Sequence, residues 1–277
     1  MKDTGIHQDA VQSDRIGLTR GFTLVEMLVV ITIIGVLAAI GLPRLSGFSA
    51  SSKMTAAARQ LMDDLQLARQ RAINSRATVY VIFVPPSISS WAGFVSSLAS
   101  VEERTLATNL LGGQLTTYAL FTRRAVGEQP GRENPRYLTP WRSLPDGIFI
   151  QVDKFLAGAT NRFNFNDFDR NAIGVNIPTL AIPFPTADSR DDYPNNPGID
   201  GIPYIAFDSR GQLVGHTDEV ISLSRGSIFY ARGTNGTLAF DVPDVQEVPP
   251  GNSTNNYSRI RIDWLTGRPK LERPELP

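Results

Sequence analysis

The stretch that decides the fold is RGFTLVEMLVVITIIGVLAAIGLP, residues Arg20 to Pro43. From Phe22 to Leu42, Glu26 is the only charged residue. At 1.5 Å per residue a helix over this segment spans about 31 Å, close to the thickness of a bilayer core. An ionised side chain in hydrocarbon costs roughly 2.5–3.5 kcal/mol. The segment therefore predicts a membrane-spanning helix that contains one carboxylate in need of an explanation.

Three interpretations compete for this segment. A secretory signal peptide has an apolar core of about 7–15 residues and no carboxylate within it. An uncleaved anchor fits the length, and a capping box formed by Thr23 and Glu26 would explain the carboxylate locally. In the third, the chain is cut between Gly21 and Phe22, which places a new ammonium one helical turn from Glu26. Pairing of the two charges, within one subunit or between neighbours, offsets much of the cost of burying either.

Gly21 followed by FTLVEMLVVITIIGVLAAI closely resembles the class III signal of type IV prepilins and type II secretion pseudopilins. The resemblance implies that residues 1–21 are a cytoplasmic leader, that prepilin peptidase cuts after Gly21, and that the amine of Phe22 is N-methylated. Glu26 then becomes an assembly residue that aligns neighbouring helices. The resemblance also implies a single pass through the bacterial inner membrane, with the globular part in the periplasm or at the cell surface after assembly.

Pro43 ends the apolar run and falls where pilins of this family commonly carry a helix-breaking proline. Proline removes a backbone donor and costs about 3 kcal/mol in a helix interior. Together with Gly35 it predicts a weak stretch of helix, which the family resemblance suggests kinks or melts when the subunit leaves the bilayer. The alternative is that Pro43 only ends the membrane helix. In both cases residues 22–42 are expected to form the transmembrane half of the N-terminal helix.

Beyond the membrane segment, residues 43–76 predict an amphipathic continuation of the helix. Apolar residues recur there at spacings of three and four and form one stripe. The stripe consists of Met54, Ala58, Leu61, Leu65, Ala68 and Ala72. Asn74, Ser75 and Arg76 are expected to end the helix, and TVYVIFV, residues 78–84, predicts a buried strand stopped by two prolines.

The segment LMDDLQLARQRAINSRATVYV resembles the GspH/FimT branch of minor pilins and pseudopilins. Weaker matches follow in family order, each an alternating strand with a glycine turn: LPDGIFI (144–150), IAFDSRGQLVG (205–215), EVISLSRG (219–226) and SRIRIDWLTGRPKL (258–271). The resemblance implies an α+β, pilin-like fold in which a long N-terminal helix, transmembrane in its first half, packs on an antiparallel sheet. Residues 77–277 would form the β-rich globular domain.

Two stretches depart from the family pattern and are expected to be loop insertions, near residues 86–143 and 155–203. In the first, residues 87–113 predict an amphipathic helix stopped by Gly112 and Gly113. Its apolar face would comprise Trp91, Phe94, Val95, Leu98 and Val101. QLTTYALFTRR (114–124) then predicts a strand. We expect the insertions at the exposed, membrane-far end of the domain.

The composition excludes several kinds of chemistry. The chain of 277 residues has no cysteine, so disulfides and thiolate metal sites are absent, and its two histidines lie far apart in sequence. Asp167, Asp169 and Asn171 alternate as in a calcium loop, but the expected glycine is Ala172. We expect a solvated turn there, an exposed His216, and no catalytic, metal or cofactor site.

DNA binding is the alternative function. Some FimT-like members take part in DNA uptake, and their arginine-rich C-terminal strand and loop resemble Arg259, Arg261, Arg268 and Lys270. Phosphate binding needs clustered positive charge. The 27 basic and 27 acidic residues balance, and acidic residues interrupt this basic run, so we do not expect nucleic acid as a partner.

The sequence therefore predicts a non-enzymatic minor pilin or pseudopilin that initiates or caps a type II secretion pseudopilus or a type IV pilus. Its partners would be other pilins or pseudopilins of the filament tip, prepilin peptidase and the inner-membrane assembly platform.

Overall fold

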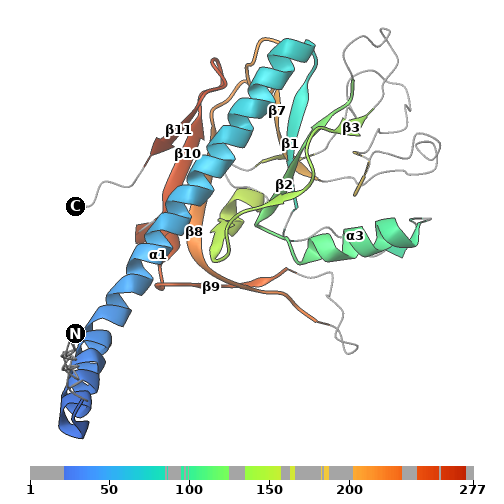
Figure 1. Ribbon diagram of the computed structural model, residues 1–277. Helices are drawn as coiled ribbons and strands as arrows, with labels where there is room; N and C mark the ends of the chain where they lie inside the picture. Colours follow the sequence, from blue (N-terminus) through green and yellow to red (C-terminus); the bar gives the residue numbers. More distant parts are fainter. Residues whose placement is uncertain are drawn as a thin grey trace, which may run out of the picture. The chain divides into compact units, whose positions relative to one another are not determined.

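The computed structural model describes residues 22–84, 86, 95–96, 98, 100–124, 135–156, 163–165, 182, 184–186, 202–232, 242–255 and 257–272. For residues 40–50 it describes the backbone and not the side chains. The chain divides into two compact units, Met1–Phe48 and Ser49–Pro277. The first unit contains the beginning of helix α1 (Leu24–Ser75), and the second contains its remainder and all the strands (Figure 1).

The part of α1 in the second unit packs through the predicted apolar stripe. Leu61, Leu65, Ala68 and Ala72 are fully buried, as are the neighbouring alanines at positions 57 and 58. The alanines among these residues have small side chains, which let the helix approach the sheets closely. The helix ends at Ser75, and Arg76 adopts a left-handed φ of 49°, which confirms the predicted end.

One sheet has six strands in the order β3-β2-β1-β7-β6, with β4 also pairing with β2. Its strands are β1 (Val79–Phe83), β2 (Thr117–Thr122), β3 (Arg136–Tyr137), β4 (Arg142–Ser143), β6 (Asn164–Phe165) and β7 (Pro203–Phe207). Every pairing is antiparallel. The strands expected at residues 78–84 and 114–124 are thus confirmed as β1 and β2.

The other sheet has five strands in the order β11-β10-β8-β5, with β9 also pairing with β8. These strands are β5 (Ile148–Ile150), β8 (Glu219–Phe229), β9 (Asp244–Glu247), β10 (Ser258–Ile262) and β11 (Pro269–Glu272), all paired antiparallel. A short 3-10 helix, η1 (Val152–Phe155), follows β5, and α4 (Asn252–Asn255) precedes β10. The α+β class with antiparallel strands is confirmed, although the strands form two sheets where one was expected.

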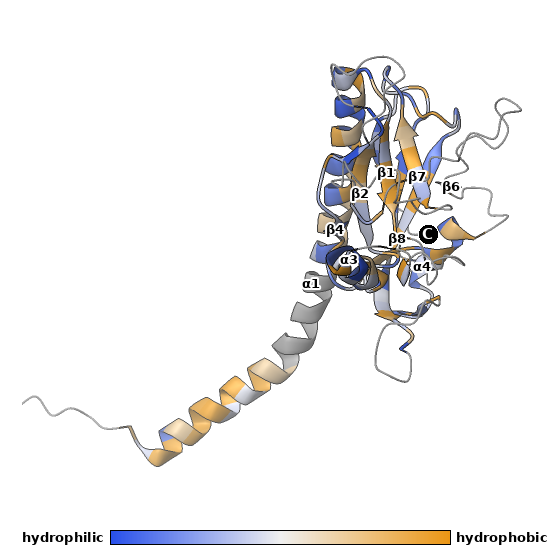
Figure 2. Cartoon of the chain, turned by 90° about the vertical axis from the view of Figure 1, so that its right-hand side faces the viewer, coloured by the Kyte–Doolittle hydropathy of each residue, from blue (hydrophilic) through white to orange (hydrophobic). Residues whose placement is uncertain are grey.

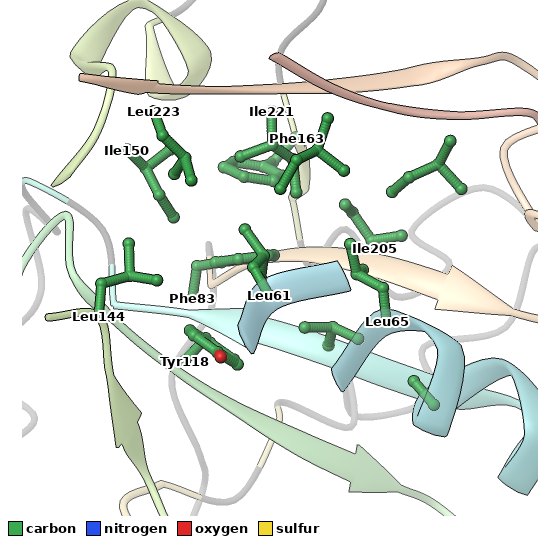
Figure 3. Close-up of a cluster of buried hydrophobic side chains, with 14 of the residues drawn as sticks. Leu61, Leu65, Phe83, Tyr118, Leu144, Ile150, Phe163, Ile205, Ile221 and Leu223 are labelled. Atoms are coloured by element: carbon green, nitrogen blue, oxygen red, sulfur yellow. The ribbon is translucent and has the colours of Figure 1, made fainter. Parts of the chain in front are cut away.

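The core lies where α1 meets both sheets. Figure 3 shows Leu61 and Leu65 among apolar side chains from the two sheets, such as Ile205 and Ile221. A second cluster lies on the other face of the six-stranded sheet, because successive residues of β1 point to opposite faces. Val81 belongs to the first cluster and Ile82 to the second. Burial on both faces explains why β1 lacks polar residues.

The second cluster is covered by helix α3 (Val101–Leu111), which begins later than the sequence predicts. Ser100 caps it by accepting a hydrogen bond from the backbone N–H of Glu102 at 3.1 Å, and Gly112 is its C-cap. The expected apolar face is wrong at Val101, which is 70% exposed, whereas Ala107, Leu110 and Leu111 of α3 are buried. Val95 and Leu98 are buried outside α3, and Trp91 and Phe94 lie outside the described residues.

The two stretches expected to be insertions contribute to the core. β2 lies within residues 86–143, pairs with β1, β3 and β4, and is buried along its whole length. From residues 155–203, Phe163 stacks on Phe83 of β1 with ring centroids 4.3 Å apart. These segments are therefore more than exposed loops, and their status as insertions into a smaller family domain stays a prediction.

Candidate processing and assembly site

The N-terminal site is built on the first turn of α1. The backbone N–H of Glu26 donates to Thr23 Oγ1 at 3.1 Å, and the backbone N–H of Thr23 donates to Glu26 Oε2 at 3.3 Å. This reciprocal pair is a capping box, in which two donors without helical partners are satisfied. The structure thus gives Glu26 a local role in starting the helix. Phe22, just before it, is 75% exposed, and Gly21 lies outside the described residues.

The capping box is compatible with the cleavage interpretation. A carboxylate in the first helical turn is stabilised by the positive end of the helix dipole. An ammonium on Phe22 would lie at that same helix end, so it would add to the positive charge around the carboxylate. Cleavage after Gly21, methylation of Phe22 and the assembly role of Glu26 remain predictions.

The helix that follows exposes large apolar side chains at successive positions. Between Leu24 and Leu37 their exposed fractions range from 43% to 82%. Figure 2 shows the hydrophobic colouring of this segment. A helix that is apolar on all sides needs either lipid or other protein around it. Among the described helical residues, none forms a stretch that is both long and apolar enough to cross a membrane.

Gly35 and Pro43, the residues predicted to weaken the helix, both lie inside α1. A Cβ added at Gly35 would meet nothing within 4 Å, so no contact with the described residues requires glycine there. The predicted kink on leaving the membrane concerns another state of the molecule and stays a prediction.

The four C-terminal basic residues proposed for DNA contact lie on the β10–β11 hairpin. Arg261 pairs in register with Lys270. Its guanidinium donates two hydrogen bonds to one carboxylate oxygen of Asp218, from Nη2 at 2.9 Å and from Nε at 3.1 Å, and lies 4.0 Å from Glu272. Hydrogen bonding to Asp218 raises the pKa of Arg261 above its ordinary value. Acidic neighbours therefore already engage the central arginine of this group.

Arg259 is also engaged, in this case by an aromatic ring. Its guanidinium lies 5.0 Å from the ring centre of Tyr257 and donates to the Tyr257 hydroxyl at 3.1 Å. Arg268 and Lys270 are exposed. The hairpin thus carries all four residues, but two of them are held by partners within the chain.

The sequence analysis also made expectations for His216, for the turn that resembles a calcium loop, and for metal sites. His216 is exposed, as predicted, and its ring meets the edge of Trp264 with centroids 5.8 Å apart. Asp167, Asp169 and Asn171 lie outside the described residues. Within the described ranges no three acidic or histidine side chains gather as a metal site would require.

Two buried polar clusters were not predicted. The hydroxyl of Tyr118 donates to Asp64 at 2.7 Å, and Arg142 forms an ion pair with the same carboxylate. Burial and the bond to Asp64 raise the pKa of Tyr118. Lys154 and Glu219 form an ion pair of 2.6 Å in which both side chains are at least nine-tenths buried. For the Tyr118–Asp64–Arg142 cluster, the one signal in the sequence was the carboxylate of Asp64, directly beside the apolar stripe at Leu65.

Comparisons with known proteins agree with the N-terminal helix and the strand that follows it. Residues 18–42 match the model of the prokaryotic N-terminal methylation motif, and residues 57–129 match that of the type II transport protein GspH. The second match extends across most of the first expected insertion. Among curated proteins none matches the chain.

Among solved structures, the chain is similar to the type IV minor pilin FimU of Pseudomonas aeruginosa strain PAO1. The identity is 12%, the alignment covers 83% of this chain and 98% of that chain, and the TM-score is 0.35. We draw nothing from a likeness this distant. The two model matches support a pilin-like subunit with a methylation-type N-terminus, similar to the GspH/FimT minor pilins.

Proposed function

We propose that this protein is a minor subunit of a type II secretion pseudopilus or a type IV pilus, cut between Gly21 and Phe22 and N-methylated on Phe22. The mature chain would sit in the bacterial inner membrane by one helix until it joins a filament, where it initiates or caps assembly. Support comes from the methylation-motif match at residues 18–42 and the GspH match that follows it.

The observation that carries the proposal is the first turn of α1 followed by an apolar surface. A carboxylate in the first helical turn is followed by large apolar side chains that are 43–64% exposed. Exposed apolar area of this extent is stable only against lipid or neighbouring helices. Both environments occur in the proposed life of the subunit, first the bilayer and then a bundle of filament helices.

The charge at Glu26 then gains a role at each step. In the bilayer its cost is offset by the ammonium of Phe22, and in the filament the same carboxylate can reach the ammonium of an adjacent subunit. Breaking a buried ion pair by removing one partner costs about 3–5 kcal/mol, because the other charge is left uncompensated. Recruitment into the filament is therefore expected to depend on Glu26 more strongly than folding of the globular unit does.

The test is mass spectrometry of the protein isolated from its native host. We expect a chain that begins at Phe22 and carries one methyl group on its amine. Gly21→Ala should leave most of the chain uncut, whereas the control Gly17→Ala, in the same leader, should be processed normally. Recovery of unmethylated chains that still begin at Met1 would refute the proposal.

A further inference from the structure

A pocket of about 270 Å³ opens at the C-terminal end of α1, in the globular unit. Its polar lining comes from three elements of the fold: Arg71, Asn74 and Ser75 from α1, Thr122 and Arg124 from the end of β2, and Arg136 from β3. Three arginines thus line one small pocket, although they are far apart in the sequence. This cluster, the Arg71–Arg124–Arg136 pocket, has no part in the function proposed above.

The fold holds the three arginines in place. Thr122 pairs in register with Arg136, which fixes the β3 arginine beside the end of β2. The hydroxyl of Thr122 donates to the carbonyl of Arg124 at 3.0 Å and so positions the backbone just beyond β2. Arg71 Nη1 donates to the carbonyl of Leu138 at 3.3 Å, which draws the helix arginine toward the same edge. The cluster is therefore built by sheet register and helix packing.

The charges in the pocket are uncompensated within the part of the chain that the structure describes. Among the described residues no acidic side chain lines the pocket, and none of the described ion pairs includes Arg71, Arg124 or Arg136. The hydroxyls of Ser75 and Thr122 donate to backbone carbonyls, so the guanidinium groups supply the charge. Three like charges that converge repel one another, and an anion between them relieves that repulsion.

We propose that the Arg71–Arg124–Arg136 pocket binds a carboxylate side chain of a neighbouring pilin-like subunit. The inference rests on the proposed function, since it names a docking contact of that assembly. The three arginines line one small pocket, which suits a single oxyanion, whereas nucleic acid needs a row of contacts along its backbone. The planar fork of guanidinium matches a carboxylate through paired hydrogen bonds.

The experiment uses the full-length protein in its native host, with the photoreactive residue p-benzoyl-phenylalanine in place of Asn74 at the pocket rim. Irradiation should give an adduct with another pilin-like subunit, linked near an Asp or Glu of that partner. Arg124→Glu combined with Arg136→Glu should lower the adduct yield about tenfold or more, since loss of one partner of a charge pair costs at least that much. Changing the linked acidic residue of the partner to Arg should restore the adduct with the doubly reversed chain.

The control is Arg210→Glu, which reverses an arginine with a side chain 70% exposed elsewhere on the unit. It should leave the adduct unchanged, and thermal unfolding of each variant confirms that the globular unit stays folded. An adduct insensitive to charge reversal, an adduct with nucleic acid, or no adduct would each overturn the inference. The same holds if Glu128→Gln with Glu133→Gln raises the adduct yield severalfold, because the chain's own loop would then fill the pocket.

Failure of this inference is distinguishable from failure of the proposed function. The mass of the N-terminus is measured in the same samples. Correct processing at Phe22 with no charge-dependent adduct removes only the pocket, whereas an uncut N-terminus removes the subunit function itself.

Discussion

Tyr118 of β2 donates a hydrogen bond to Asp64 of α1 at 2.7 Å, and this contact fixes the helix on the sheet at a buried site. Asp64 is 3% exposed and Tyr118 is fully buried. Gln60, one turn earlier on the helix, donates to the same hydroxyl at 3.1 Å. Most of the side chains buried between the helix and the sheets are apolar, so this buried polar cluster helps to set the register between the two elements.

Asp64→Asn should therefore lower the free energy of unfolding by about 1–3 kcal/mol, because it leaves a buried partner unsatisfied and removes the charge opposite Arg142. The control Asp63→Asn changes the adjacent exposed carboxylate and should stay within about 0.5 kcal/mol. Urea unfolding of the full-length protein in detergent, followed by tryptophan fluorescence, measures both. Equal effects of the two substitutions would show that the buried cluster contributes nothing specific.

The two roles of Glu26 can be separated by choosing which property to remove. Glu26→Gln keeps a side chain that can complete the capping box but removes the charge. Thr23→Ala removes the cap, at a cost of about 1 kcal/mol to the helix, but keeps the carboxylate. We expect Glu26→Gln to be processed and yet recruited into the filament at least tenfold less, and Thr23→Ala to be recruited nearly normally.

Quantitative immunoblotting of sheared filaments against the membrane fraction measures that recruitment. If Glu26→Gln assembled as well as the wild type while Thr23→Ala did not, capping would be the function of the pair. The ion-pair explanation would then be wrong.

The sequence predicts best those features that depend on local periodicity. The stripe through Leu61 and Leu65, the end of α1 at Ser75 and the strands β1 and β2 follow from spacing and turn residues, and the structure confirms them. Alternation in a strand identifies its two faces but not the strand that it pairs with. For that reason the division into two sheets could not be foreseen.

Features that depend on contacts distant in sequence were missed. Asp64 resembles any polar residue on a helix, and only Tyr118 and Arg142, 54 and 78 residues further along, make its burial possible. The face of α3 was misassigned because helical spacing continues through Ser100, whose capping bond starts a new helix. The arginine pocket had no sequence signal, since its members come from three separate elements.

DNA binding by the C-terminal hairpin gives a prediction that can fail clearly. Arg261 is held by Asp218 and Arg259 by Tyr257, so few positive charges are available to release counterions from DNA. Each phosphate neutralised contributes about −0.9 to the slope of log affinity against log salt. We expect full-length protein in detergent to bind duplex DNA weakly, with a nearly flat slope. A steep slope that disappears in Arg268→Ala with Lys270→Ala would instead establish the DNA alternative.

Three carboxylates at the ends of strands predict how stability depends on pH. Hydrogen bonds with Ser253 lower the pKa of Glu247 from its usual 4.5. Hydrogen bonds from Thr266 lower that of Asp263 from 3.8. Partial burial opposes the shift at Asp208, but the backbone N–H groups of Gln212 and Arg210 still lower its pKa. All three carboxylates are therefore more acidic in the folded chain.

A group with a depressed pKa in the folded state stabilises the protein above its unfolded pKa, and this contribution is lost as the pH falls through the folded value. The free energy of unfolding should therefore be constant in this respect above about pH 4.5 and decrease below it. Urea unfolding at pH 6 and pH 3 measures the difference, and Asp208→Asn combined with Glu247→Gln should reduce it. Glu219 acts in the opposite direction, because burial raises its pKa, so Glu219→Gln should make the acid sensitivity greater. An unchanged pH dependence in the double variant would mean that these carboxylates do not determine acid stability.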